Sequence, residues 1–355
     1  MKSKTNFLLA NLFFAAAFAA NAQTISLTTT TPTSSATVGG GTSLRIGTGA
    51  GANLAATAGA NVFIGNATGG LNTTGANNTF VGWAAAPANT TGEYNTMIGR
   101  SAGNAQTTAS NNTYVGALTG LKTTTGSGNT FVGFGAGYEN VSGGNNTISG
   151  WGSGGLLNSW GNTIYGYRAG NTAIGDGNTL VGSAAGFKAG SGNVMIGINA
   201  GYNDTGNNKL YISNSDTATP LIWGDFAASQ LKLNGKVGIG AVSVYPTNPL
   251  YTNYKLFVTG GILTDEIRVK LSASGTWADY VFAKNYNLPT LNEVEEFIAK
   301  NGHLKNVPSA SDIKENGIDV AEIVKVQQEK IEELTLYIIS QNKRLEALEA
   351  KINNK

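Results

Sequence analysis

The side chains that most often carry out chemistry in proteins are scarce in this chain of 355 residues. It holds one histidine, His303, and no cysteine, so a Ser-His-Asp arrangement would have to be built around that single imidazole. His303 follows Gly302, a residue type that often ends helices, so we interpret it as a capping or surface residue. No Cys or His cluster has the spacing of metal ligands. The sequence therefore predicts a protein that is not an enzyme and that binds no cofactor or metal.

The acidic residues of the glycine-rich part are isolated from one another. Glu93, Glu139, Asp176 and Asp204 fall at different phases of the repeat described below, so they predict no stacked calcium-binding array. The many Gly-x-Gly matches are interpreted as turns, because no helix follows them to complete a phosphate-binding loop. Carboxylates far apart in sequence can still meet in space, so a polysaccharide-binding or polysaccharide-degrading tail spike stays open as an alternative.

Charge divides the chain into two regions. Residues 23 to 211 carry ten charged side chains, whereas residues 262 to 355 carry twenty-seven. The formal net charge of +2 falls to about zero once Lys2 and Lys4 leave with a signal peptide, so neither nucleic acid nor an anionic membrane is expected as a partner.

The N-terminus predicts export. Lys2 and Lys4 precede an apolar run from Phe7 to Ala20, and a small-residue cleavage site ends at Ala22, which is typical of a secretory signal peptide. No later stretch reaches about 18 uninterrupted apolar residues, so no membrane-spanning helix is expected. We expect an extracellular or cell-surface protein.

A repeat of the form Asn-Thr-apolar-Val/Ile-Gly organises the glycine-rich part. Its asparagines are spaced by 17 residues five times, then by 16 twice and by 15 twice. Each repeat is too short for a helical pair and rich in turn formers, so it predicts one coil of a β-solenoid over residues 44–212, with glycines at two corners. Coils stack about 4.8 Å apart, which predicts a hydrogen-bonded asparagine ladder of Asn61, Asn78, Asn95, Asn112, Asn129, Asn146, Asn162, Asn178, Asn193 and Asn208.

Two apolar columns adjoin this ladder. Because neighbouring residues of a strand point to opposite faces, we expect one column to fill the coil and the other to need cover, either from another copy of the chain or from a loop of the same coil. The first column is Phe63, Phe80, Met97, Tyr114, Phe131, Ile148, Ile164, Leu180 and Met195; the second is Ile64, Val81, Ile98, Val115, Val132, Val181 and Ile196. A threonine column, Thr79, Thr96, Thr113, Thr130, Thr147, Thr163 and Thr179, leaves an ice-binding solenoid open as a second alternative.

The remaining segments are assigned by their patterns. Residues 1–22 are the predicted signal peptide, 23–43 an N-terminal linker, 213–271 a β adaptor of short alternating strands with an inserted loop at 244–254, and 272–318 a small α/β neck module. Within the neck module, Thr290 and Glu293 form a capping box that predicts a helix ending at Gly302. Asp319 and Glu322 repeat this signature at the start of the last segment, 319–355.

That last segment predicts a coiled coil. Apolar residues recur every seven positions, with leucines three residues after two of them and Gln327 and Gln341 at other d positions, which is an a/d seam. The predicted core is Val324, Ile331, Leu334, Ile338, Gln341, Leu345, Leu348 and Ile352. β-branched residues at a with Leu at d lean toward two strands, so the heptads leave dimer and trimer open. A helix folded back on its own domain is the other interpretation.

Two parts of the sequence resemble known families. The Asn-Thr-Phe-Val-Gly and Ala-Gly periodicity of residues 44–212 resembles the head repeats of trimeric autotransporter adhesins, although the repeat here is longer. That resemblance implies parallel β-rolls wound into a trimer on a coiled-coil stalk. A second resemblance, to the end module of secreted tail-fibre-like proteins of Bacteroidetes, implies a fibre-like architecture. It rests on the segments Trp277 to Phe282, Leu288 to Leu291, His303 to Leu304, Val307 to Ser309 and Ile331 to Tyr337.

The sequence thus predicts a mainly β fold: a short-coil β-solenoid, or parallel β-roll, with a C-terminal α-helical coiled coil, assembled as a homotrimer. The expected function is that of a non-enzymatic adhesin or structural surface fibre. Its expected partners are further copies of itself and a glycan or other cell-surface ligand.

Overall fold

The computed structural model describes residues 36–38, by their backbone, together with residues 43–55, 57–155, 158–241, 252–270 and 276–353. The predicted signal peptide, most of the N-terminal linker and most of the predicted loop at 244–254 lie outside these residues. The chain divides into two compact units, Met1–Thr259 and Gly260–Lys355.

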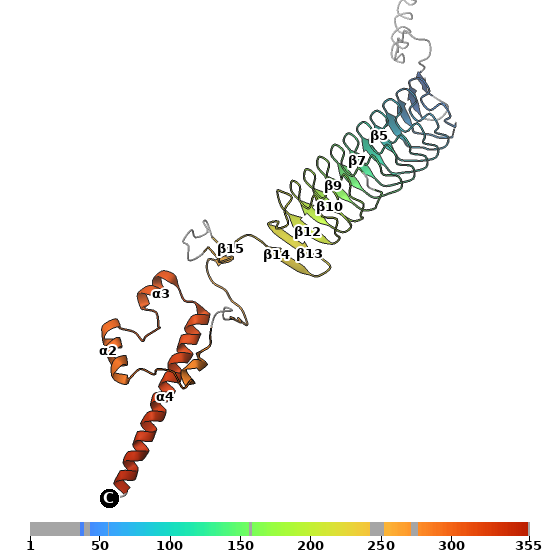
Figure 1. The fold of residues 1–355 in the computed structure, drawn as a ribbon. Helices are drawn as coiled ribbons and strands as arrows, with labels where there is room; N and C mark the ends of the chain where they lie inside the picture. Colours follow the sequence, from blue (N-terminus) through green and yellow to red (C-terminus); the bar gives the residue numbers. More distant parts are fainter. Residues whose placement is uncertain are drawn as a thin grey trace, which may run out of the picture. The chain divides into compact units, whose positions relative to one another are not determined.

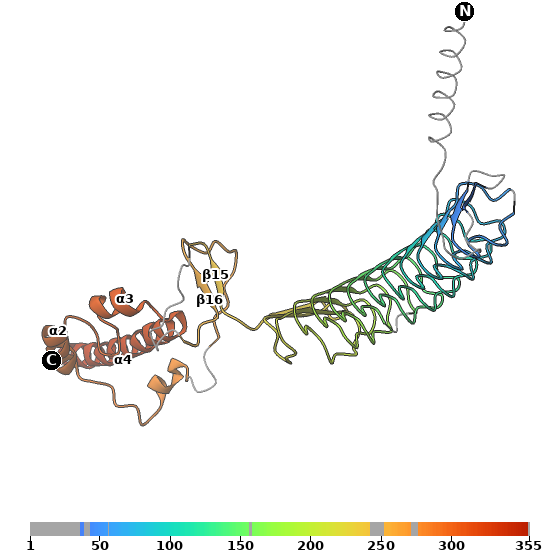
Figure 2. The ribbon, with the colours of Figure 1, turned by 90° about the horizontal axis from the view of Figure 1, so that it is seen from above.

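The first unit contains a β-solenoid whose 14 strands follow one another in sequence order in one sheet (Figure 1). Strands β2 to β12 pair in parallel, one strand per coil, and Figure 2 shows them along one side of the stack. They are β2 (Leu44–Ile46), β3 (Val62–Ile64), β4 (Thr79–Val81), β5 (Thr96–Ile98), β6 (Thr113–Val115), β7 (Thr130–Val132), β8 (Thr147–Ser149), β9 (Thr163–Tyr165), β10 (Thr179–Val181), β11 (Val194–Ile196) and β12 (Lys209–Ile212).

The strands are short because a glycine follows each of β2 to β11 at a sharp corner. Gly82 has a φ of +136°, and a Cβ placed there would lie 2.5 Å from the carbonyl oxygen of Gly99 in the next coil. A second corner lies four residues after each of these glycines. In the coil of Gly99 this position is Gly103, which has a φ of +59° and whose Cβ would meet the Met97 side chain. At the first corner only glycine combines this backbone conformation with this closeness of neighbouring coils, whereas at the second corner Ala86, with a φ of +43°, replaces glycine in one coil.

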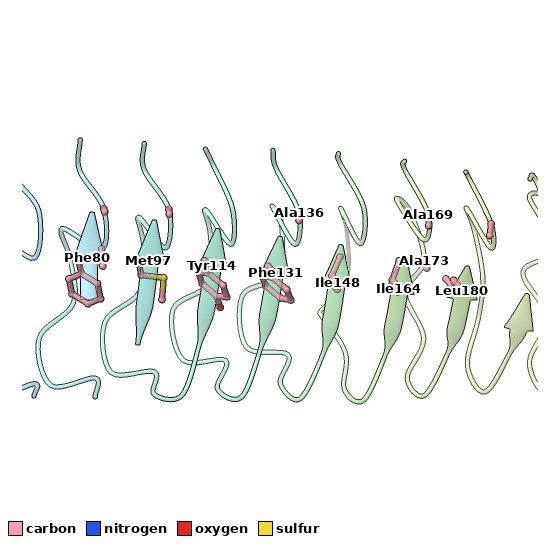
Figure 3. Close-up of a cluster of buried hydrophobic side chains, with 14 of the residues drawn as sticks. Phe80, Met97, Tyr114, Phe131, Ala136, Ile148, Ile164, Ala169, Ala173 and Leu180 are labelled. Carbon is pink, nitrogen blue, oxygen red and sulfur yellow. The ribbon is translucent and has the colours of Figure 1, made fainter. Parts of the chain in front are cut away.

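The first predicted apolar column fills the interior of the stack. Its nine side chains, Phe63 to Met195, are at most 1% exposed, and in Figure 3 Phe80, Met97, Tyr114 and Phe131 lie in a row on successive strands. Small residues such as Ala136 face them from the far side of the coil. The rings of Tyr114 and Phe131 stack with centroids 4.8 Å apart, so the core is a column of dispersion contacts between successive coils.

Antiparallel strands close both ends of the stack. Strand β1 (Ala36–Val38) pairs with β2, and β13 (Ile222–Asp225) and β14 (Gln230–Leu233) follow β12 in the same sheet. These two strands lie in the predicted 213–271 adaptor, yet they extend the solenoid sheet. A separate two-stranded parallel sheet forms from β15 (Val237–Ile239) and β16 (Leu256–Val258).

The second unit is helical. It contains a 3-10 helix η2 (Ala278–Phe282) and the helices α2 (Leu291–Asn301), α3 (Ala310–Asn316) and α4 (Val320–Asn353). Helix α2 begins with the predicted Thr290–Glu293 capping box and ends at Gly302, whose φ is +76°. Asp319 accepts hydrogen bonds from the first-turn amides of α4. Among the described residues, no helix is both long and apolar enough to cross a membrane.

Candidate interaction surfaces

The predicted asparagine ladder forms from Asn61 to Asn193, and each of its members is at most 1% exposed. Each Asn Oδ1 accepts the backbone N–H of its equivalent in the next coil, as between Asn112 and Asn129 at 2.8 Å. The Nδ2 of most members donates to a backbone carbonyl of the next coil, as from Asn78 to Gly92 at 2.8 Å. The ladder therefore satisfies buried polar groups that the corners leave outside the sheet.

The assignment of Asn208 to this ladder is wrong by one residue. Strand β12 pairs so that Leu210 lies beside Val194, and the Asn193 Oδ1 accepts the N–H of Lys209 at 2.8 Å. Asn208 instead adopts a left-handed φ of +58° and is exposed. Asn208 and Leu210 resemble the Asn-x-apolar motif of the repeat. In the observed register, however, Tyr211 lies beside Met195 and takes the inward position, whereas a ladder through Asn208 would require Leu210 there.

A second buried polar ladder was not predicted. It adjoins the first ladder, where the Gln106 side-chain oxygen accepts from Asn112 Nδ2 at 3.1 Å, and its members are fully buried. The Asn140 amide, for example, donates to the Gly143 carbonyl at 3.0 Å. The 17-residue spacing would have revealed this ladder, which comprises Asn72, Asn89, Gln106, Thr123 and Asn140.

The outer face of the solenoid sheet carries the threonine column and the second apolar column side by side. Ile98, Val132, Val181 and Ile196 are 37–40% exposed, whereas their inward neighbours on the same strands are fully buried. No loop of the same coil covers these described residues. The outer face is thus a strip of mostly β-branched side chains along the stack, interrupted in the second column by Ser149 and the exposed Tyr165.

An exposed aromatic column lies at the first corner, one residue after the strand glycine. Phe134, Trp151 and Tyr167 occupy equivalent positions in three successive coils, and their rings stack with centroids 6.0 Å and 5.2 Å apart. Each ring is about half exposed. This column was not predicted from the sequence, although all three residues directly follow the strand glycine of their coil.

The apolar seam of α4 is on the surface of the second unit. Ile331, Leu334 and Ile338 are 56–58% exposed, and the values for the other apolar members of the predicted core, Val324, Leu345, Leu348 and Ile352, are 45–71%. Gln341 is also exposed. The side chains of α4 that are buried are Val326 and three glutamates, Glu329, Glu332 and Glu333.

Two of these buried glutamates, Glu329 and Glu333, hold the neck module to α4. The Tyr280 hydroxyl donates to Glu329, Asn306 Nδ2 donates to the same carboxylate at 3.1 Å, and the Tyr286 hydroxyl donates to Glu333 at 2.5 Å. Lys330 bridges both carboxylates, at 2.7 Å from Glu329 and 2.9 Å from Glu333. The contacts between the module and the helix are therefore largely polar and charge-assisted.

These contacts shift the pKa values of the groups involved. Burial alone would raise the pKa of Glu329, but hydrogen bonds from Lys330, Tyr280 and Asn306 outweigh it and lower the pKa below the ordinary 4.5. The hydrogen bond to Glu329, together with burial, raises the pKa of Tyr280 to about 12. Both shifts favour an ionised glutamate and a neutral tyrosine.

Helix α2 leaves its apolar face largely uncovered. None of its residues is buried, and Leu291 and Ile298 are 50% and 43% exposed. A cleft of about 300 Å³ separates α2 from α4 and is lined by Leu291, Val294 and Leu334 among others. Two apolar helix faces thus flank a space that the chain itself does not fill.

His303 lies at the surface of this unit. Its Nδ1 is 2.9 Å from the Leu304 carbonyl oxygen, and its ring meets the edge of Phe297, as expected for a residue beside a helix end. Within the described ranges, no three His, Cys, Asp or Glu side chains are grouped so that they could hold a metal ion.

Comparisons with protein-family profiles, with curated proteins and with solved structures found no match.

Proposed function

We propose that this protein is an exported, non-enzymatic fibre that assembles as a parallel homotrimer and acts as an adhesin or structural surface fibre. The solenoid is its shaft, and the α4 helices of three copies form a coiled coil that fixes the register of the shafts. Trimer rather than dimer is proposed because the repeats resemble the head repeats of trimeric autotransporter adhesins, whereas the heptads alone allow either.

The observation that carries this proposal is the polarity of α4. Helix α4 buries Glu329, Glu332 and Glu333 against its own chain and exposes Ile331, Leu334 and Ile338. A soluble helix normally does the reverse, because burying carboxylates requires compensating partners whereas burying apolar side chains is favourable. Tyrosine, asparagine and lysine supply those partners for Glu329 and Glu333, and the Gln328 Nε2 donates to one oxygen of Glu332 at 2.9 Å. The apolar seam is consequently left for other copies of the chain.

The solenoid face supports the same proposal. The interior of the solenoid is filled by side chains of one chain, so the outer strip with Ile98 and Val132 is not part of the core of its own coils. The threonine column lies beside this apolar column and not beside a second threonine column, which favours burial in an assembly over ice binding.

Light scattering coupled to size-exclusion chromatography on residues 23–355 tests the proposal. We expect a mass three times that of the chain. Replacing Ile331, Leu334 and Ile338 together by serine should yield a monomer, because each change removes exposed apolar area from the seam and keeps the glutamate side chains that bond the neck module.

The matched control is the triple change of Glu295, Glu296 and Lys300 to serine on α2, which alters exposed polar positions and should leave the mass unchanged. A monomeric wild-type protein would refute the trimeric fibre. A dimeric wild-type protein would still support association through the α4 seam but would refute the trimer.

A further inference from the structure

The aromatic column borders a groove whose glycine floor and polar side chains are specific to a few coils of the solenoid. The groove crosses three successive coils, has a volume of about 390 Å³, and is lined by Phe134, Tyr138 and Trp151 on its aromatic sides and by Glu139, Arg168 and Asn171 as polar groups. This size lies within the range of small-ligand sites, which combine apolar walls with a few convergent polar groups.

Glycines create the floor of the groove. Gly135 and Gly152 occupy the corner position at which other coils carry Ala67, Ala84 or Leu118, all with φ between +50° and +58°. The corner conformation therefore does not demand glycine at this position. A Cβ on Gly135 would have no atom within 4 Å, so the missing side chain leaves open space. Gly155 removes a further side chain from the groove.

The charge around the groove favours an anionic group. Glu139 is neutralised by Lys122, whose Nζ lies 2.6 Å from its carboxylate. Arg168 is exposed, lies with its guanidinium 5.3 Å from the centroid of the Phe187 ring, and forms no ion pair among the described residues. One uncompensated guanidinium, with its planar set of donors, thus stands at the groove and suits a carboxylate.

The aromatic walls favour a sugar as the carrier of that carboxylate. Trp151 stacks between Phe134 and Tyr167, with centroids 6.0 Å and 5.2 Å apart, so the half-exposed edges of the Phe134 and Trp151 rings form the apolar wall. This wall can contact the apolar C–H groups of a sugar ring. Asn171, whose Nδ2 already donates to the Gly152 carbonyl at 2.6 Å, keeps its side-chain oxygen to accept from a hydroxyl.

We propose that this groove binds a carboxylated sugar residue, a uronic acid within a surface polysaccharide. Arg168 pairs with the carboxylate, Phe134 and Trp151 pack against the ring, and the glycine floor admits it. The inference rests on the proposed function in that it assigns a ligand class to the adhesin, but the groove lies within one chain.

The test uses the mature protein, residues 23–355, on an array of immobilised tetrasaccharides that contain glucuronate, galacturonate or mannuronate, with neutral tetrasaccharides of the same length beside them. We expect binding to at least one uronate glycan and none to its neutral counterpart. Arg168→Gln should weaken it roughly tenfold to a hundredfold, the value of a hydrogen bond to a charged group.

A second variant separates the groove from the charge. Gly135→Leu places in the groove a side chain that Leu118 shows the corner accepts, and it should abolish binding. The matched control, Gly49→Leu, changes the equivalent glycine of the first coil, outside the groove, and should bind as the wild type does.

Each other result overturns the inference in a recognisable way. An oligomer of the proposed mass that binds no uronate glycan, or binds it equally after both groove changes, refutes the groove and leaves the fibre standing. A groove variant with a smaller mass identifies this surface as an interface between copies. A wild-type monomer that binds uronate through Arg168 refutes the trimer and leaves the groove standing.

Discussion

Tyr114 is the one residue of the interior column that carries a hydroxyl group. Its side chain is fully buried, burial raises its pKa well above the ordinary value of 10, and its oxygen forms no hydrogen bond of ordinary geometry with the described residues. Phe63, Phe80 and Phe131 occupy equivalent positions. We therefore expect Tyr114→Phe to increase the free energy of unfolding by roughly 1 kcal/mol, because a buried unpaired hydroxyl is unfavourable.

Chemical denaturation followed by the β-sheet circular dichroism of the shaft measures this change. Phe131→Ala is the contrasting variant, and it should lower the free energy of unfolding by about 3–5 kcal/mol through the cavity it leaves. A clear loss of stability in Tyr114→Phe would mean that the hydroxyl has a partner after all.

Side chains that share one motif position were predictable at the scale of the residue. The motif from Asn61 to Asn193 predicts which side chains are buried even where its spacing falls from 17 to 16 and 15 residues, because a stack repeats the same environment in each coil. At Asn208 the motif is offset from the register that the sheet imposes. The groove escaped prediction because it depends on what is missing, namely the side chains of Gly135 and Gly152, and sequence does not separate these glycines from those that the corners require.

At the scale of elements, the contacts between α4 and the neck module predict a pH dependence. The pKa of Glu329 is lowered from 4.5 in the folded state, so its contribution to stability is present above about pH 4.5 and is lost as the pH falls through the lowered value. The pKa of Tyr280 is raised to about 12, so its contribution is present below about pH 10 and is lost as the pH rises toward that value. The module should be most stable between these limits.

Thermal unfolding followed by helical circular dichroism, at pH values from about 3 to 7, checks the acidic side. Glu329→Gln should lower the Tm at neutral pH and flatten its decline in acid. Glu295→Gln, an exposed change on α2, should leave both as in the wild type. If the Glu329 variant kept the steep acid decline, another carboxylate would be responsible.

Helix boundaries in this unit were predictable where the caps are explicit. The Thr290 box and Gly302 bracket α2 as expected, but α3 was missed, although Ser309 and Asp312 form the same reciprocal box and Gly317 ends the helix. Its seven residues are too few to show an apolar period. The heptad pattern also did not predict that α4 buries glutamates and exposes its apolar seam. The partners of these glutamates, Tyr280 and Tyr286, lie in a segment whose path is known only from the structure.

At the scale of the whole molecule, the two units should differ in how they depend on assembly. The shaft has a complete core within one chain, and the antiparallel strands β1, β13 and β14 close its ends. The helical unit leaves its apolar surfaces open. We therefore expect the Tm of the helical unit to rise with protein concentration, because association stabilises only the folded form, and the Tm of the shaft to depend on it less.

Calorimetry over a hundredfold range of concentration, with circular dichroism to assign the two transitions, tests this difference. In the Ile331→Ser, Leu334→Ser, Ile338→Ser protein the concentration dependence of the helical transition should vanish, while the β-sheet signal of the shaft persists. The control with polar changes on α2 should behave as the wild type. Loss of the shaft signal in the seam variant would show that the outer strip of Ile98 and Val132 must be covered before the coils can stack, and the proposed coiled coil would then be a requirement for folding and not only a clamp.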